Sequence, residues 1–122
     1  MVPYAIPPKV APPATGRLYL VGSATAGGWN NPVPVPLQEF TKISETLYQI
    51  TVPLIGGQEY LLLPLNGDWG HKYAVKDNSV AGLAEGGDFG FDLSKNFPGP
   101  AASGNYKIVV DFQRGKFAVT KM

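Results

Sequence analysis

Residues 106–121 read YKIVVDFQRGKFAVTK, a stretch in which apolar and polar side chains alternate on both sides of a short turn. In its first half every second residue from Tyr106 to Phe112 is apolar, and the same spacing returns at Phe117 and Val119. Because successive side chains of a strand point to opposite faces, a period of two predicts two half-buried strands. With the turn at Gln113-Arg114-Gly115 between them, the segment predicts a β-hairpin that places Phe117 and Val119 inward.

Three segments upstream of the hairpin also read as strands. Residues 46–54 are apolar at alternate positions, and residues 17–21 form a short apolar run. Residues 59–65 are almost continuously apolar, which is typical of a central strand covered on both faces, with Pro64 near its end, where the missing N–H costs least. No segment shows a convincing helical period. The sequence therefore predicts an all-β protein, an immunoglobulin-like β-sandwich of about seven short strands.

Long irregular stretches interrupt these strands at residues 22–42 and 66–100. A compact domain retains loops of this length mainly when they are functional or disordered, so function is expected in these two stretches. The N-terminal residues 1–16 are different, with five prolines between Pro3 and Pro13. This density favours extended backbone and predicts a linker, with an edge strand at residues 4–6 as the alternative. The folded module is expected to span residues 17–122.

The composition limits the classes of partner. A chain of 122 residues with 44% hydrophobic residues is sufficient for one packed domain. Ten basic and nine acidic residues leave a net charge of +1, and no basic run is present, so the sequence predicts no nucleic-acid partner. No apolar run approaches the ~20 residues that span a bilayer, and no signal-peptide layout is present. A neutral ligand suits this chain better.

Catalytic and cofactor-binding groups are sparse in the sequence. There is no cysteine, and His71 is the only histidine, so no Cys-His pair, multi-histidine metal site or cofactor is expected. His71 is interpreted as a polar loop residue. Two carboxylates would suffice for a glycosidase, and calcium also binds carboxylates, but acidic loop residues more often cap turns. The acidic residues in question are Asp68, Asp77, Glu85, Asp88 and Asp92. We therefore expect a protein that is not an enzyme.

The two tryptophans lie in the irregular stretches, among residues that suit sugar binding. A flat aromatic face covers the apolar C–H side of a pyranose, and amide, carboxylate or cationic groups bond its hydroxyls. Trp29 lies in AGGWNN (residues 26–31), and the alternatives of an exposed indole beside Asn30 and of a lid on the sandwich both stay open. Trp69 lies in NGDWGHKY (residues 66–73), where a packing role is favoured over a ligand role because a buried strand precedes it. There Lys72 and Tyr73 are candidate partners.

Four ordered segments carry a resemblance to a known family: LYLVG (residues 18–22), GGWN (27–30), NGDWG (66–70) and GNYKIVVDF (104–112). In this order and spacing the chain resembles the repeated module of SusE and SusF, the outer-membrane starch-binding lipoproteins of Bacteroidetes. Gly86-Gly87-Asp88 also resembles the module's Gly-Gly-Asp/Asn loop, which can place a polar side chain beside the ligand. The chain departs from the family in holding one module, in lacking a lipid-accepting cysteine, and in the prolines of residues 32–36.

The resemblance implies a non-catalytic module at the outer membrane that binds starch or another oligosaccharide and acts beside other modules of a parent protein and other glycan-uptake components. It implies an aromatic, a basic and an amide-type residue in the site. Modules of this type can also lose sugar binding and serve as spacers, which is the alternative function. The residues that match the implied site or lie beside it are Trp29, Asn30, Trp69, Lys72, Tyr73 and Asp88.

Overall fold

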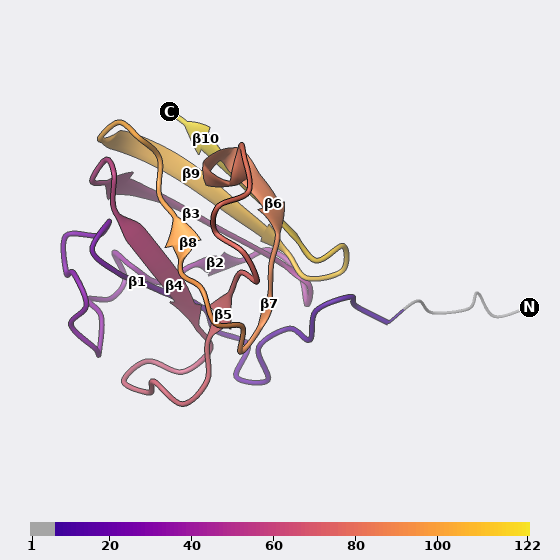
Figure 1. The fold of residues 1–122 in the computed structure, drawn as a ribbon. Coiled ribbons are helices and arrows are strands. Elements are labelled where there is room, and N and C mark those ends of the chain that lie inside the picture. Colours follow the sequence, from indigo (N-terminus) through magenta and orange to yellow (C-terminus); the bar gives the residue numbers. More distant parts are fainter. Residues whose placement is uncertain (1–6) are drawn as a thin grey trace, which may run out of the picture.

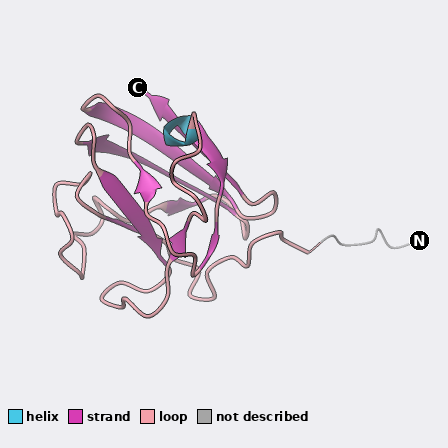
Figure 2. Cartoon of the chain, in the orientation of Figure 1, coloured by secondary structure: helices cyan, strands magenta, loops and turns pink. Residues whose placement is uncertain are grey.

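The computed structural model describes residues 7–122, which form two antiparallel β-sheets packed together (Figures 1 and 2). The first sheet has the order β1-β4-β5-β7, with β8 also paired to β4, and the second has the order β2-β3-β9-β10-β6. The strands are β1 (Tyr19–Val21), β2 (Thr41–Lys42), β3 (Leu47–Leu54), β4 (Glu59–Leu63), β5 (Tyr73–Ala74), β6 (Gly86–Asp88), β7 (Gly90–Phe91), β8 (Phe97–Pro98), β9 (Gly104–Asp111) and β10 (Lys116–Lys121). The predicted all-β sandwich is confirmed, and its immunoglobulin-like character stays a prediction.

The C-terminal hairpin forms as predicted. Strands β9 and β10 pair antiparallel, with Val110 opposite Phe117 and Ile108 opposite Val119. These four side chains are buried, whereas Val109 and Ala118, which alternate with them, are partly or fully exposed. The turn contains Gly115 at φ 66°, a left-handed conformation that glycine adopts without a Cβ penalty. β9 also pairs with β3 along its whole length, so the hairpin forms the centre of the second sheet.

Strand β4 is covered on both faces, as its continuous apolar sequence predicts. Tyr60 and Leu62 belong to the main core between the sheets. Leu61 and Leu63 belong to a second apolar cluster on the opposite face, which Val33 of the β1–β2 loop helps to cover. β4 ends at Leu63, directly before proline, and pairs with β1 on one side and with β5 and β8 on the other.

The stretch of residues 66–100 contains more regular structure than the sequence indicates. It includes β5, β6, β7, β8 and a 3-10 turn, η1 (Leu83–Glu85), so the described residues hold ten strands and not about seven. Three of these four strands have two residues and the fourth has three. Such short segments are too brief to show a period, and they form by pairing with strands that are remote in the sequence or equally short.

The proline-rich N-terminal segment lies against the sandwich where the structure describes it. Lys9 and Val10 donate backbone hydrogen bonds to Gln113 and Phe112 at 3.1 Å each, and Val10 is buried in the main core. Tyr73 on β5 donates its hydroxyl to the carbonyl of Ala11 at 2.7 Å. Residues 9–11 are therefore an integral part of the packed domain. The alternative edge strand at residues 4–6 lies outside the described residues.

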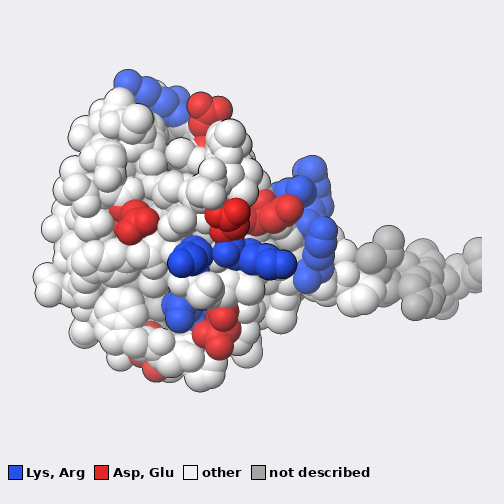
Figure 3. All heavy atoms as spheres, in the orientation of Figure 1, with Lys and Arg blue, Asp and Glu red and all other residues white. Residues whose placement is uncertain are grey.

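Charged groups are dispersed over the molecule. Figure 3 shows acidic and basic side chains interspersed on a face that is mostly uncharged. Within residues 7–122 no helix is long and apolar enough to cross a membrane.

Candidate functional site

The two tryptophans lie side by side, although 40 positions separate them in the sequence. Trp29 belongs to the β1–β2 loop and Trp69 to the β4–β5 loop. Their ring centroids are 6.3 Å apart and their planes are inclined by 44°. The two indoles are 41% and 46% exposed. The interpretation of Trp69 as mainly a packing residue is therefore wrong, because β4 ends at Leu63 and the chain leaves the sheet before Trp69.

A buried glutamine shapes the turn that presents Trp29. Gln38 is 2% exposed, and its Nε2 donates to the carbonyl of Leu20 at 2.8 Å and to Oγ1 of Thr25 at 3.2 Å. Its Oε1 accepts from the amide of Gly27 at 3.1 Å. Gly28 then has φ 59°, with open space around its Cα, so the chain turns sharply before the indole. The satisfied amide stabilises this turn, which belongs to no named strand.

Two asparagines join the tryptophan loops, each reaching into the backbone of the other loop. Asn66 accepts from the amide of Val33 at 2.8 Å and donates to the Val33 carbonyl at 3.2 Å. Asn31 accepts from the amide of Gly67 at 2.7 Å. We call Asn31 and Asn66 with these three hydrogen bonds the asparagine clasp. Neither residue was among the site residues that the sequence predicted, because a contact over more than thirty positions leaves no local pattern.

Asp68 orders the chain on either side of Trp69. Its Oδ1 accepts from the amide of Gly70 at 2.9 Å, and its Oδ2 lies 3.0 Å from Nδ1 of His71. The hydrogen bond from His71, followed by that from Gly70, lowers the pKa of the Asp68 carboxyl. A carboxylate can only accept, so Nδ1 of His71 is the donor. The prediction that loop aspartates cap turns is confirmed here and at Asp77, which accepts from the Ser79 amide at 2.9 Å.

The remaining predicted site residues, Asn30, Lys72, Tyr73 and Asp88, lie in four different environments. Asn30 is exposed next to Trp29. The Nζ of Lys72 lies 3.8 Å from Oδ1 of Asp92, directly after β7. Tyr73 is 2% exposed, and burial raises the pKa of its hydroxyl, so it is a core residue with no free ring face. Asp88 lies on β6, in the other sheet, and forms an ion pair with Lys116 at 2.6 Å.

The Gly-Gly-Asp segment is a strand and not a loop. Gly86 and Gly87 pair with Ala118 and Phe117 of β10. A Cβ on Gly86 would lie 2.5 Å from the carbonyl oxygen of Phe117, so the close approach of the two strands requires glycine. The expectation that this segment places Asp88 in a ligand loop therefore loses its basis. The neighbouring Lys116 lowers the pKa of the Asp88 carboxyl through their hydrogen bond.

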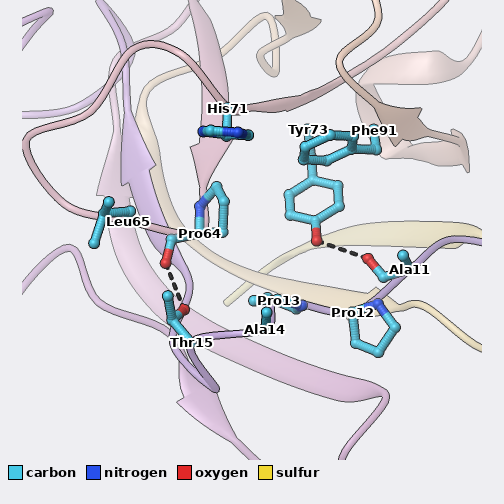
Figure 4. A pocket seen from close by; sticks show the side chains of 10 residues that line it. All are labelled: Ala11, Pro12, Pro13, Ala14, Thr15, Pro64, Leu65, His71, Tyr73 and Phe91. Atoms are coloured by element: carbon cyan, nitrogen blue, oxygen red, sulfur yellow. Dashed lines mark hydrogen bonds between the residues drawn. The ribbon is translucent and has the colours of Figure 1, made fainter.

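An apolar cavity of about 390 Å³ lies on the same β4–β5 loop (Figure 4). Residues 11–15 form one wall, and Leu65, His71, Tyr73 and Phe91 contribute to the others. Two of its hydroxyls are already engaged, since Tyr73 donates to Ala11 and Thr15 donates to the Pro64 carbonyl at 2.6 Å. A cavity with so few free polar groups cannot bond the hydroxyls of a sugar, so the indole pair is the better candidate site.

No protein-family model matches the chain, and comparison with curated proteins finds no match. Among residues 7–122 no group of three or more histidine, aspartate or glutamate side chains is arranged to hold a metal ion. The features that bear on function are therefore the geometry of the indole pair and the chemistry of the side chains around it.

Proposed function

We propose that this domain is a non-catalytic glycan-binding module and that the exposed pair of Trp29 and Trp69 is its binding surface. The observation that carries the proposal is the pairing of two half-exposed indoles from separate loops. Exposing large aromatic faces to water is unfavourable, and a binding surface is a common reason for retaining them. Pyranose rings offer apolar C–H faces that match an indole, with hydroxyls left for neighbouring polar groups.

Polar side chains at the rim of the pair support a sugar ligand. Asn30 is exposed beside Trp29, and its side chain has no hydrogen-bond partner among the described residues. Asp68 precedes Trp69 and is about one-third exposed in its side chain. Together they offer an amide and a carboxylate to sugar hydroxyls at the edges of the indoles. The scarcity of charge on the visible face (Figure 3) also suits a neutral ligand.

The absence of catalysis belongs to the same proposal. A glycosidase needs two carboxyls facing one another across the scissile bond. Here Asp68 bonds to His71, Asp77 to Ser79, and Asp88 to Lys116, so each of these three carboxyls has its own local partner. We therefore propose that the domain binds a glycan without cleaving it.

Starch is the proposed ligand, and the outer surface of a bacterial outer membrane is the proposed location. Both come from the resemblance to SusE and SusF modules. The inclination of 44° between the indoles supports this choice, because a bent platform suits a curved glucan better than a flat chain. In this proposal other modules of a parent protein strengthen the weak binding expected of one small platform.

Affinity gel electrophoresis with amylopectin tests the proposal. The parent domain should be retarded, and Trp29→Ala and Trp69→Ala should each weaken binding about tenfold, or ~1.4 kcal/mol. Since both indoles are about half exposed, each substitution should cost only about 1 to 2 kcal/mol of stability. Phe91→Ala is the matched control, because Phe91 is also exposed, at 43%, but lines the apolar cavity.

The outcomes separate the alternatives. If a flat β-glucan retards the domain and amylopectin does not, the indole pair remains the proposed binding surface, and its ligand is a β-glucan and not starch. If the parent domain is retarded by no glycan in a panel of α- and β-glucans, xylan and chitin, the spacer function is supported. If Phe91→Ala loses as much binding as the tryptophan variants, the glycan site would instead be assigned to the apolar cavity.

A further inference from the structure

The asparagine clasp connects the two tryptophan loops within four residues of each indole. Asn31 lies two residues after Trp29, and its hydrogen-bond partner Gly67 lies two residues before Trp69. Each loop thus carries an indole and one member of the clasp. No strand ladder joins these loops, since the β1 and β4 strands they leave end at Val21 and Leu63. Figure 1 draws the loops next to one another, away from the centre of the sandwich.

The clasp is anchored to the folded core through Val33. Both the amide and the carbonyl of Val33 bond to Asn66, and its side chain is 4% exposed. That side chain packs in the apolar cluster with Leu61 and Leu63 of β4. The position of the β1–β2 loop is therefore fixed relative to β4, which is also the strand from which the Trp69 loop leaves.

From this geometry we propose that Asn31 and Asn66 are positioning residues that set the spacing and inclination of the two indoles, and through them the affinity for glycan. The second half of this inference rests on the proposed function. Holding two separate loops in one arrangement before the ligand arrives reduces the ordering cost of binding. Neither asparagine needs to contact the ligand for this effect.

The two asparagines make different hydrogen bonds, so substitution by aspartate should have different effects at the two positions. Asn66 uses both ends of its amide, as acceptor from the Val33 amide and as donor to the Val33 carbonyl. Asn31 uses only its Oδ1, because its buried Nδ2 has no hydrogen-bond partner among the described residues. An aspartate at position 31 therefore retains the acceptor that Gly67 needs. An aspartate at position 66 loses a donor and places a carboxylate against a carbonyl oxygen, which is repulsive.

Circular dichroism provides a readout that is independent of any ligand. Closely spaced indoles couple their electronic transitions and give an exciton couplet in the far ultraviolet. The chain has two tryptophans, so the part of the far-ultraviolet signal that is lost in Trp29→Ala reports on the pair of Trp29 and Trp69. A substitution that merely lowered stability would leave the couplet intact well below the melting temperature.

The experiment compares Asn31→Ala, Asn31→Asp, Asn66→Ala and Asn66→Asp by the couplet, thermal melting and amylopectin retardation. Both variants at position 66 should lose most of the couplet and bind about tenfold more weakly, with Asn31→Ala affected less. Asn31→Asp should be the mildest of the four. Asn105→Ala is the matched control, because Asn105 is an exposed asparagine on β9 and belongs to neither tryptophan loop.

Each result decides the inference. A parent-like couplet in folded Asn66→Ala would overturn it, and so would equal effects of aspartate at the two positions. If the position 66 variants fail to fold, the comparison of Asn31→Ala with Asn31→Asp still tests the role of the Gly67 bond. If the parent domain binds no glycan while the couplet follows the predicted order, the proposed function fails and the positioning role stands.

Discussion

The core between the sheets and the pair of tryptophan loops are stabilised by different interactions. In the core, Phe112 is fully buried and its ring contacts the rings of Tyr48, Tyr73 and Phe89 at centroid distances of 5.0 to 5.6 Å. Area removed from water stabilises such a cluster, and many neighbours share each contact. In the loops, Asn66 makes two hydrogen bonds to the backbone, and Asn31 and Asp68 make one each, with no strand ladder between the two loops.

Because of this difference, substitutions in the core and substitutions in the loops should affect different properties of the domain. A change of volume in the core affects the stability of the whole domain, because strands of both sheets contribute to the same cluster. A change of one amide in the loops affects the arrangement of the indoles and leaves the sandwich folded. Stability and binding are therefore expected to separate between the two regions.

The largest effect is expected for Phe112→Ala. Truncating a fully buried phenylalanine removes apolar contact and leaves a cavity, so the free energy of unfolding should fall by about 3 to 5 kcal/mol. The matched variant Phe91→Ala alters a side chain that is 43% exposed and should cost about 1 kcal/mol. Urea denaturation followed by circular dichroism measures both. Similar losses in the two variants would contradict the contrast between core and surface aromatics.

The alternating strands of this fold could be predicted from the sequence because their signal is local. The hairpin of β9 and β10 needs only the period of two and the Gly115 turn. The double coverage of β4 follows from its unbroken apolar run. The residue that covers its outer face, Val33, could not be identified, because it lies among prolines in a loop with no period.

The candidate site was predicted in part. Both tryptophans are candidate ligand residues in the sequence, which leaves the exposure of Trp29 open and favours packing for Trp69. Their ring-centroid distance of 6.3 Å depends on how two remote loops fold together. Asp88 was misplaced because a pair of glycines reads as a loop, whereas here the glycines permit close approach to β10. The asparagine clasp is a tertiary contact and has no signature in a single sequence.

Acidification is expected to have an intermediate effect. It should change the arrangement of the Trp69 loop and leave the sandwich unchanged. Hydrogen bonds from His71 and then Gly70 lower the pKa of Asp68 below its ordinary value of 3.8. The stabilisation that this carboxylate provides is therefore fully present above that value and is lost as the pH falls through the lower folded value. Tryptophan fluorescence should therefore show a step below about pH 4, where the Asp68 carboxyl is protonated.

Substitution of Asp68 by asparagine isolates this effect. The amide Oδ1 of Asp68→Asn can still accept from Gly70, but the side chain no longer titrates, so the acid step in fluorescence should disappear. Asp77→Asn is the control, because Asp77 is also a turn carboxylate with a lowered pKa, bonded to Ser79 in a different segment. An acid step that persists unchanged in Asp68→Asn would assign the transition to another carboxyl or to the core.

The smallest effect on binding and stability is expected for Asp88→Asn. This variant tests a residue that the sequence pattern places in the site and that the structure places on the other sheet. Asp88 lies at the edge of the second sheet, exposed, with Lys116 as its partner. An ion pair between exposed side chains contributes little, because water and salt screen it. Asp88→Asn should therefore leave amylopectin retardation, the indole couplet and the melting temperature unchanged within error. A selective loss of glycan retardation in this variant would instead show that the ligand reaches β6, and the indole pair would then be only one part of a longer site.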